Sequence, residues 1–233
     1  MTNQEVMEQI QGRLIVSCQA LKEEPLHSSY IMSRMAYAAM LGGACGIRAN
    51  STQDITEIKK LVQLPVIGII KHIYEGSNIY ITPTMKEIDE LVECGCEIIA
   101  MDATNRIRPY NKTLKEFYKE VREKYPNQLF MADCSNYEEG IEAAKLGFDL
   151  VGTTLSGYTD YTKDRVLPDT ELVKRLSNEC GITVIAEGGI WTPEELSAVF
   201  DAGAYAAVVG TAITRPMDIT LRFNQAIKSK RQE

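Results

Sequence analysis

The sequence predicts a single (β/α)8 barrel, and three observations lead to this fold class. Eight short apolar or β-branched segments alternate with amphipathic helical segments along the 233 residues. Successive apolar segments start 21 to 33 residues apart, which leaves room for a helical crossover between parallel strands. Every second segment follows a glycine at a helix end, and this alternation suits a closed barrel in which odd and even strands fill alternate core layers.

The eight predicted strands follow from the apolar runs. They are Arg13–Ser17, Ala44–Ile47, Val66–Ile70, Ile98–Met101, Leu129–Ala132, Leu150–Gly152, Thr183–Ala186 and Ala206–Val209. The glycines that precede the even-numbered strands are Gly43, Gly95, Gly147 and Gly203. A glycine there suits the left-handed stop of a helix and a short turn into a buried strand.

The helices between the strands are indicated by caps and by apolar period. Capping-box spacing occurs at Thr84 with Glu87, Ser135 with Glu138 and Thr192 with Glu195, and Pro193 suits a first helical position. One apolar face recurs in five helical segments: Ile88, Leu91 and Val92; Leu114, Phe117, Tyr118 and Val121; Leu172, Val173 and Leu176; Leu196, Val199 and Phe200; Ile219, Phe223 and Ile227. We expect each helix to bury that face.

The two ends of the chain lie outside the eightfold pattern. We expect Asn3–Ile10 to form an extra helix across the bottom of the barrel and Lys228–Glu233 to form a solvated tail. A linker rich in Pro, Gly or Ser is absent from the sequence, so residues 1–233 are expected to form one catalytic domain. A doubly wound open sheet is the structural alternative.

Composition and charge narrow the class of partner. Apolar residues make up 45% of the chain and charged residues 24%, which is the range of globular proteins. A net charge of -7 and a pI near 5.1 argue against nucleic acid or an anionic membrane as the main partner. The apolar runs are far shorter than the ~20 residues that cross a bilayer, and the N-terminus lacks the basic and apolar regions of a signal peptide. These features predict a cytoplasmic protein.

Cysteine and histidine usage bears on metals and redox state. Six cysteines are spread through a chain of ordinary size, so we expect reduced thiols rather than a disulfide framework. Cys94 and Cys96 form the only close pair, and with His27 and His72 the only histidines there is no second ligand pair at zinc spacing. We therefore expect no metal.

The active site of a (β/α)8 barrel lies at the carboxyl ends of its strands. The residues that follow the apolar runs are polar throughout: Gln19, Arg48, Lys71, Asp102, Asp133, Thr153, Glu187 and Thr211. Any one of them alone would be an ordinary strand-ending residue. Eight on one rim indicate a site.

Lys71 and Glu187 are the strongest candidates for chemistry. Lys71 ends the run Pro-Val-Ile-Gly-Ile-Ile, so it could be a base with a lowered pKa, a Schiff-base former or a fixed cation for a substrate oxygen. A lysine that only reaches out to solvent from the barrel edge is the bland alternative. Glu187 has the same placement on the seventh strand, either as an acid-base partner of Lys71 or as a carboxylate that neutralises Lys71 or Arg48.

Two glycine-containing loops on adjacent strands indicate a phosphate site. Gly188 and Gly189 follow the seventh strand, and Gly210 leads to Arg215 after the eighth. Backbone N–H groups of such loops approach phosphate oxygens closely, and an arginine neutralises the charge. The alternative for Arg215 is an ordinary surface arginine.

Beyond these features, the chain resembles the N-acetylmannosamine-6-phosphate 2-epimerases of amino-sugar and sialic acid utilisation. The resemblance spans essentially the whole chain. It is carried by Leu-Ile-Val-Ser-Cys-Gln19, Gly46-Ile-Arg48-Ala-Asn, Gly68-Ile-Ile-Lys71, Asp102-Ala-Thr-Asn-Arg-Ile-Arg-Pro109, Ala132-Asp133-Cys-Ser, Gly152-Thr-Thr-Leu-Ser-Gly-Tyr-Thr159, Ala186-Glu187-Gly-Gly and Val209-Gly-Thr-Ala-Ile-Thr-Arg215. The fourth and sixth of these motifs are the most specific.

The resemblance implies interconversion of N-acetylmannosamine 6-phosphate and N-acetylglucosamine 6-phosphate at C2, without metal or nicotinamide. It places the functional lysine at Lys71 and the acid at Glu187, whose role as second proton carrier or ring-opening group stays open. The implied substrate contacts are Gln19, Arg48 and Asp133, with Thr154 and Tyr158 from the sixth loop, and the implied phosphate contacts are Gly189, Gly210, Thr211 and Arg215.

Two other functions compete with epimerisation, and the oligomeric state is a separate expectation. A class I aldolase or lyase would use Lys71 as a Schiff base, and a non-catalytic sensor would bind the same sugar phosphate without turnover. We expect a homodimer.

Overall fold

A computed structural model describes residues 1–179 and 181–229 of the chain. Its strands close into an eight-stranded parallel barrel in sequence order, with β8 paired to β1. The strands are β1 Leu14–Cys18, β2 Gly46–Asn50, β3 Val66–Ile69, β4 Ile98–Asp102, β5 Leu129–Asp133, β6 Leu150–Gly152, β7 Thr183–Glu187 and β8 Ala206–Val209. Closure confirms the predicted (β/α)8, or TIM, barrel, and the open-sheet alternative is wrong.

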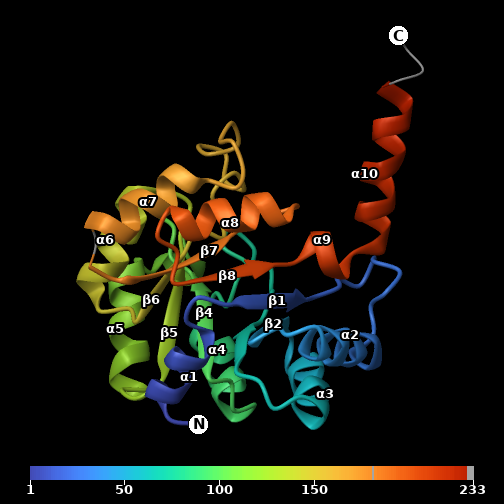
Figure 1. The fold of residues 1–233 in the computed structure, drawn as a ribbon. Coiled ribbons are helices and arrows are strands. Elements are labelled where there is room, and N and C mark those ends of the chain that lie inside the picture. The colour runs from blue at the N-terminus through green and yellow to red at the C-terminus, as the bar shows by residue number, and fades with distance from the viewer. Residues whose placement is uncertain (180, 230–233) are drawn as a thin grey trace.

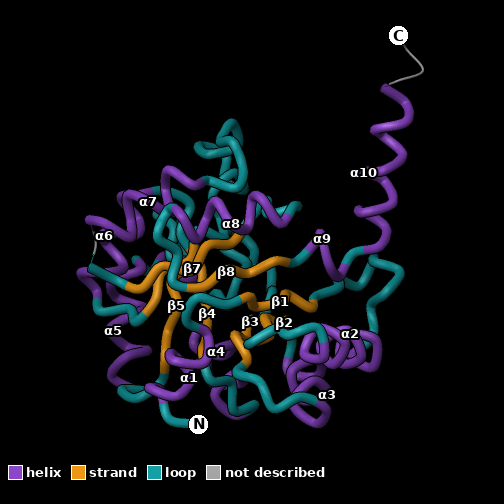
Figure 2. The backbone as a smooth tube through the Cα atoms, in the orientation of Figure 1, coloured by secondary structure: helices purple, strands orange, loops and turns teal. Residues whose placement is uncertain are grey.

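Helices surround the strands, as Figures 1 and 2 show. They are α2 Ser29–Leu41, α3 Thr52–Leu61, α4 Met85–Glu93, α5 Leu114–Lys124, α6 Tyr137–Leu146, α7 Thr170–Glu179 and α8 Pro193–Asp201, each following the strand of one lower number. A short 3₁₀ turn, Pro109–Asn111, precedes α5, and α9 (Thr211–Thr214) and α10 (Pro216–Ser229) follow β8. No helix in the described ranges is long and apolar enough to cross a membrane.

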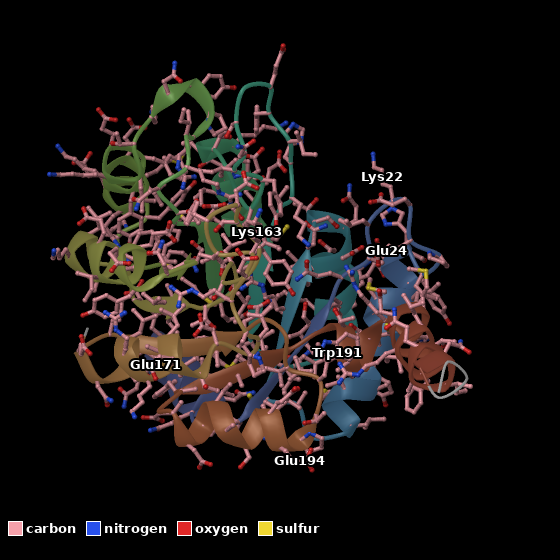
Figure 3. All side chains as sticks on the ribbon, turned by 90° about the horizontal axis from the view of Figure 1, so that it is seen from above. Lys22, Glu24, Lys163, Glu171, Trp191 and Glu194 are labelled. Carbon is pink, nitrogen blue, oxygen red and sulfur yellow. The ribbon has the colours of Figure 1, made fainter. Side chains whose placement is uncertain are left out.

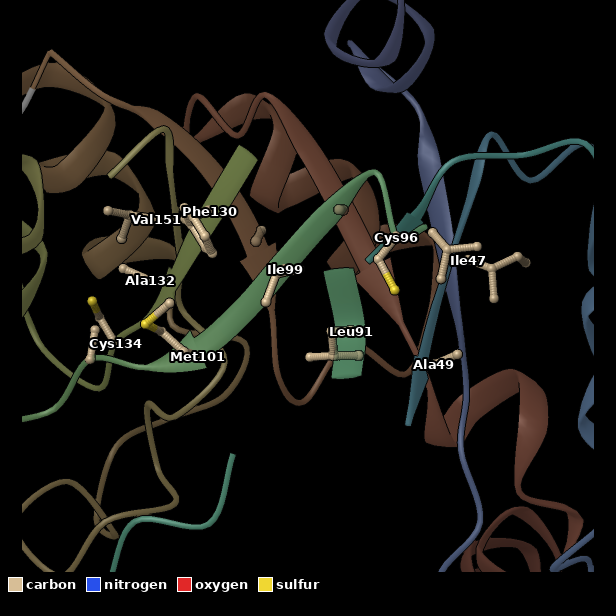
Figure 4. Close-up of a cluster of buried hydrophobic side chains, with 14 of the residues drawn as sticks. Ile47, Ala49, Leu91, Cys96, Ile99, Met101, Phe130, Ala132, Cys134 and Val151 are labelled. Carbon is tan, nitrogen blue, oxygen red and sulfur yellow. The ribbon is translucent and has the colours of Figure 1, made fainter. Parts of the chain in front are cut away.

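Alternation along the strands divides the core into two layers. Outward-facing strand residues, such as Ile47, Ile99 and Phe130, pack against the helices (Figure 4). Inward-facing residues, such as Ile15 and Met131, fill the barrel interior. Asp133 and Glu187 follow inward-facing Met131 and Ile185 by two positions and end β5 and β7, so they stand at the carboxyl ends of the strands, where a site can form.

The predicted extra N-terminal helix is α1, with the expected bounds Asn3–Ile10. Its buried residues Val6 and Ile10 belong to the interior core cluster and close the bottom of the barrel. Asn3 donates a side-chain hydrogen bond to the carbonyl of Asn127, and Gln9 donates one to that of Cys45. Both carbonyls precede strands, so α1 is fastened to the amino-terminal rim.

Strand bounds differ from the expected ones by at most three residues. β2 starts at Gly46 rather than Ala44 because the turn that ends α2 continues through Ala44, whose N–H donates to the Ala39 carbonyl. β4, β5 and β7 each run one residue further, because their last residues still take part in parallel pairing. Asp102, Asp133 and Glu187 are therefore strand residues, and Arg48 lies in the middle of β2.

The caps at Thr84 and Thr192 are confirmed as capping boxes, with Pro193 at the start of α8. The cap predicted at Ser135 is wrong by one residue. The N-cap of α6 is Asn136, whose side chain accepts from the N–H of Glu139. Ser135 instead donates both its N–H and its hydroxyl to the Glu139 carboxylate. The four predicted helix-end glycines all have positive φ, between 69° and 102°.

The C-terminal helix is the largest departure from expectation. α10 stands away from the barrel in Figure 1, and Phe223 and Ile227 are 72% and 54% exposed. The expectation that this helix buries its apolar face against the barrel is wrong. α10 also runs through Ser229, so the first two residues of the expected tail Lys228–Glu233 are helical, and residues 230–233 lie outside the described part of the chain.

Candidate active site

A cavity of about 250 Å³ opens at the carboxyl ends of the strands. It is lined by Ser17, Gln19, Arg48, Ile69, Lys71, Tyr80, Ile81, Thr154, Leu155, Tyr158, Glu187, Gly188, Gly189, Ile190, Trp191, Val208, Gly210, Thr211, Thr214 and Arg215. Ten of the eleven residues expected at the site are in this set, and Asp133 is the exception. Strand alternation explains the convergence: Lys71 follows inward-facing Ile69 by two positions, and Glu187 follows inward-facing Ile185 in the same way.

Arg48 and Asp133 form a buried ion pair beneath the cavity. Their side chains are 1% and 0% exposed, and both guanidinium Nη atoms of Arg48 donate to the carboxylate, at 3.1 and 2.6 Å. Burial opposes the charge on Arg48, but Asp133 and then Glu187 outweigh it and raise the pKa of Arg48. Asp133 therefore lies behind the cavity wall, where it holds Arg48, rather than in contact with the cavity.

Glu187 completes this network from β7. Its Oε2 lies 2.8 Å from Nη1 of Arg48, and the Thr154 hydroxyl bridges Asp133 at 2.7 Å and Glu187 at 3.2 Å. The Thr153 hydroxyl donates to the backbone carbonyl of Glu187 and accepts from the Glu187 N–H. Burial raises the pKa of Glu187 to about 7, because it outweighs the Arg48 charge. The carboxyl group is thus held in place and can accept or release a proton near neutral pH.

Lys71 lies across the cavity at the end of β3. Its N–H donates to the Asn50 side chain at 2.8 Å, and its backbone bridges Ile81 on the returning loop. Burial lowers the pKa of Lys71 to about 8, with further lowering by the positive charges of Arg48 and Arg215. Among the described residues no carboxylate lies within ion-pair distance of the Lys71 ammonium group, since Glu187 is paired with Arg48 instead. Lys71 therefore combines a cavity position with an appreciable neutral fraction.

The two glycine loops lie side by side at one end of the cavity. Gly189 has a φ of +71°, and a Cβ placed on it would lie 2.3 Å from Cβ of Leu167. Gly210 is the N-cap of the four-residue helix α9, which begins at Thr211. Arg215 ends this turn, and its Nη2 lies 2.9 Å from a carboxylate oxygen of Glu24 in the loop after β1. The expected phosphate contacts are thus adjacent, and their arginine is paired within the protein.

Gln19 and Tyr158 frame the remaining walls. The Gln19 amide donates to the Ser17 hydroxyl at 2.9 Å, while its buried carbonyl oxygen has no hydrogen-bond partner in the described structure. Tyr158 is 57% exposed as a whole residue and stands at the mouth. Burial of its phenol raises the pKa of Tyr158. An unpaired acceptor and a phenol give the cavity two more polar groups that can contact a ligand.

Besides Asp133, two further strand-end residues do not line the cavity. Asp102 is fully buried and pairs with Arg106, and Thr153 supports Glu187 from behind. Arg108, from the same motif as Asp102, is 2% exposed, donates to the Pro83 and Asp102 carbonyls, and lies over the Phe117 ring. The Asp102–Pro109 motif therefore braces the loop after β4 rather than forming the cavity wall.

Tyr80 is a cavity residue that the sequence reasoning missed. It lies in the loop after β3, which folds back so that the Tyr80 carbonyl accepts from the His72 N–H and Ile81 comes beside Lys71. Ser17 and Trp191 also line the cavity. Ser17 precedes Gln19 by two positions, so strand alternation could have predicted that its side chain faces the cavity. The return of residues 70–82 toward the cavity has no comparable signal in the local sequence.

The two histidines and the cysteines in the described part of the chain do not line the cavity. His27 is exposed, with one ring nitrogen 3.1 Å from the Ala20 carbonyl, and His72 is exposed and packs its ring near Tyr74. Burial raises the pKa of the Cys18 thiol to about 12, which makes it unreactive at neutral pH. Within the described ranges there is no group of three His, Cys, Asp or Glu side chains that could hold a metal ion.

Comparison with known proteins gives a family match and several similar relatives. Residues 32–229 match the model of a family described as "Putative N-acetylmannosamine-6-phosphate epimerase". Two relatives named "Putative N-acetylmannosamine-6-phosphate 2-epimerase" are similar over nearly their whole length. That of Caldanaerobacter subterraneus subsp. tengcongensis is 56% identical over 227 residues, covering 97% of this chain and 96% of the relative. That of Clostridioides difficile is 58% identical over 223 residues, covering 96% and 99%.

Solved structures give the same result. The N-acetylmannosamine-6-phosphate 2-epimerase from Clostridium perfringens superimposes with a TM-score of 0.90 at 56% identity, covering 94% of this chain and 95% of that one. Thiamine phosphate pyrophosphorylase from Pyrococcus furiosus superimposes with a TM-score of 0.62 at 17% identity, over 91% and 92% of the two chains, which shows the shared fold alone. This chain belongs to the N-acetylmannosamine-6-phosphate epimerase family.

Proposed function

We propose that this chain interconverts N-acetylmannosamine 6-phosphate and N-acetylglucosamine 6-phosphate by proton transfer at C2. The observation that carries the proposal is Lys71, a cavity lysine without an ion-pair partner in the described structure, whose pKa is lowered to about 8 by burial. Family membership supports the substrate pair. The reaction makes this chain an isomerase of carbohydrate metabolism, in amino-sugar and sialic acid catabolism.

The chemistry of the sugar explains why such a lysine is needed. The hydrogen on C2 becomes acidic only when the ring opens and C1 is an aldehyde. A base then removes that proton, a cation or acid stabilises the enolate oxygen, and a proton returns to the opposite face of C2. Neutral Lys71 is the proposed base. Glu187, with a pKa near 7, either returns the proton from the second face or opens the ring.

The rest of the cavity supplies recognition. Arg48, Gln19, Thr154 and Tyr158 are the proposed contacts to the sugar hydroxyls and the N-acetyl group. Asp133 is assigned a different task from the one expected, because its carboxylate is fully buried against Arg48. It acts through Arg48, whose guanidinium it orients. An arginine held by two hydrogen bonds presents a fixed donor to the ligand.

The phosphate is assigned to the glycine loops. Gly189 and Gly210 allow close backbone approach, Thr211 adds a hydroxyl, and Arg215 neutralises charge. These groups lie in the segments that follow β7 and β8, away from Lys71, which follows β3. The proposed base and the proposed phosphate contacts therefore belong to separate segments, so they can be tested by separate substitutions.

We further propose one catalytic domain over residues 1–233, which works in the cytoplasm as a homodimer. The acidic net charge and the dispersed cysteines support the compartment. The exposed apolar residues of α10 support self-association, since a second copy would cover them. Catalysis without a metal or organic cofactor predicts that activity survives exhaustive chelation and dialysis. Activity that disappears with EDTA and returns with a divalent ion would contradict that part.

The decisive experiment follows C2 directly. N-acetylmannosamine 6-phosphate is incubated with the protein in deuterated water and monitored by proton NMR. The proposal expects loss of the C2 proton signal together with appearance of the glucosamine epimer. Turnover without deuterium at C2 would overturn proton transfer. Borohydride trapping of a substrate adduct on Lys71, with cleavage products, would instead indicate a Schiff-base aldolase, and binding without any turnover would indicate a sensor.

A further inference from the structure

The loop between β1 and α2 places a carboxylate on the proposed phosphate-binding arginine. Glu24 Oε1 lies 2.9 Å from Nη2 of Arg215, and the two side chains are only 15% and 30% exposed. Figure 3 shows Glu24 on this loop, which borders the start of the C-terminal helix. Within residues 1–179 and 181–229, Arg215 is the one side chain that forms an ion pair with Glu24. The pair is sheltered enough for its charges to be weakly screened.

Arg215 stands between two cavities. One side of it lines the 250 Å³ cavity that contains Lys71, and the other lines a smaller cavity of about 140 Å³. Glu24 lines only the smaller one. Arg215 is therefore shared between an internal carboxylate on one side and the place proposed for the substrate phosphate on the other.

A phosphate group that enters between the glycine loops meets this arrangement before it binds. It must share or take over a guanidinium that already has an anion beside it. A second anion close to Glu24 is repelled, and that repulsion is strong where water is partly excluded. A weakly charged anion gains too little binding free energy from Arg215 to offset this repulsion. A phosphate dianion on a sugar that also fills the rest of the cavity gains more binding free energy.

Resting on the function proposed above, we propose that Glu24 is a specificity-determining residue of the phosphate site. It is an internal anion that holds Arg215 until the phosphate of a complete substrate displaces it. The loop that carries Glu24 suits such a role, because it consists of short turns, with N–H bonds from Glu24 to the Leu21 carbonyl and from His27 to the Glu24 carbonyl. Displacing the carboxylate requires no change in a strand or helix.

The test compares two neutral variants of neighbouring residues. Glu24→Gln keeps the size of the side chain and removes the competing charge. Glu23→Gln removes the same charge one position earlier, from an exposed side chain that makes no ion pair in the described structure, and controls for long-range electrostatics. The probe is inorganic phosphate, measured as a competitive inhibitor of epimerisation and by calorimetric titration of the same protein.

The proposal expects Glu24→Gln to bind inorganic phosphate about three- to tenfold more tightly, and Glu23→Gln to change binding by less than about twofold. The substrate should gain less than inorganic phosphate, so the ratio of the two affinities should fall. Unchanged or weaker phosphate binding in Glu24→Gln would overturn the proposal and would indicate that Glu24 only orients Arg215.

A third variant separates this inference from the function on which it rests. Arg215→Ala should weaken inorganic phosphate binding by about ten- to a hundredfold. If it does and Glu24→Gln has no effect, only the role of Glu24 is wrong. If Arg215→Ala leaves phosphate binding unchanged, the phosphate assignment itself is wrong, and the role of Glu24 is lost with it.

Discussion

At the scale of single residues, the cavity brings the pKa values of a lysine and a glutamate close together. Burial lowers the pKa of Lys71 to about 8 and raises the pKa of Glu187 to about 7. Their ordinary values are about six units apart. Groups whose pKa values lie near the working pH are effective in both donating and accepting protons. The same burial that brings these two pKa values together costs folding free energy.

Replacement of Lys71 tests that balance. Lys71→Ala should abolish both epimerisation and deuterium entry at C2, and Lys71→Met, which keeps the side-chain volume, should do the same. The pKa of Lys71 falls from about 10.5 in the unfolded chain to about 8 in the folded one. The charged form is therefore penalised in the folded state, by up to about 3 kcal/mol at pH 7.

Lys71→Met should accordingly raise the free energy of unfolding by about 1 to 3 kcal/mol at pH 7 in urea titrations. The wild-type stability should rise between pH 8 and pH 10.5, where the unfolded chain binds more protons, and the difference from the variant should shrink there. Lys22→Met, at an exposed lysine, is the control and should change stability by less than about 0.5 kcal/mol. Epimerase activity in Lys71→Ala would refute the assignment of the base.

Glu187→Gln distinguishes the two roles left to the carboxyl group. A variant that still exchanges C2 with solvent but does not invert it would assign the second face to Glu187, whereas loss of exchange as well would assign ring opening or activation of Lys71. The carboxylate also raises the pKa of Lys71. Its removal should therefore move the acid limb of the kcat/KM profile below pH 8. An acid limb that stays in place or moves upward would contradict this influence of Glu187 on Lys71.

The direction of a side chain could be predicted from the sequence where strand alternation alone decides it. Lys71 and Glu187 face inward because they follow inward-facing residues by two positions. Asp133 faces inward by the same rule, yet its carboxylate accepts hydrogen bonds from Arg48 and Thr154 instead of contacting the cavity. Whether a polar group contacts the cavity or another side chain depends on the residues opposite it across the barrel, which one strand's pattern does not contain.

At the scale of elements, the loops decide the shape of the site more than the strands do. The strands were predictable to within three residues because their apolar runs, crossover lengths and helix-end glycines agree with one another. The loop that returns Tyr80 to the cavity was not, since its return depends on backbone bonds to the end of β3. The N-cap of α6 is Asn136 rather than Ser135 for a comparable reason. The Ser135 hydroxyl, like that of Tyr161, donates to the Glu139 carboxylate and therefore does not cap the helix.

The contact between two loops gives a prediction at this scale. Gly189 has a φ of +71° and lies against Leu167, which comes from the loop after β6. Gly189→Ala should cost the backbone penalty of about 1 kcal/mol or more and also displace Leu167 from the phosphate loop. We expect kcat/KM for the phosphorylated sugar to fall at least about tenfold.

Gly12→Ala is the matched control for that substitution. Gly12 has nearly the same φ, +66°, but open space where a Cβ would stand, and it lies at the bottom of the barrel. It should lose similar stability in urea titrations while keeping its kinetics. Equal kinetics in the two variants would show that the Leu167 contact does not shape the phosphate site.

At the scale of the whole molecule, the barrel is complete in its strands and incomplete in its cover. Seven helices follow β1 to β7 and pack around the sheet. After β8 and the short α9, the helix α10 stands away from it. Arg222, in the middle of α10, contacts the loop after β7, with its guanidinium 4.6 Å from the centre of the Trp191 ring. The apolar period of this helix was legible in the sequence, but a periodic apolar face does not say which chain buries it.

A second copy of the chain would cover the exposed apolar residues of α10. Four apolar side chains of α10 are at least half exposed: Met217, Leu221, Phe223 and Ile227. In a two-fold symmetric dimer each copy contributes the same patch, so one substitution acts twice. Loss of a buried Phe costs about 1.5 to 3 kcal/mol per copy, and Phe223→Glu should therefore weaken dimerisation by roughly a hundred- to ten-thousandfold. Gln225→Glu introduces the same residue at an exposed polar position of the helix and should leave the dimer intact. Sedimentation equilibrium of the two variants and the wild type measures the effect, and a wild-type monomer at micromolar concentration, or equal association in the two variants, would show that α10 is not the contact surface.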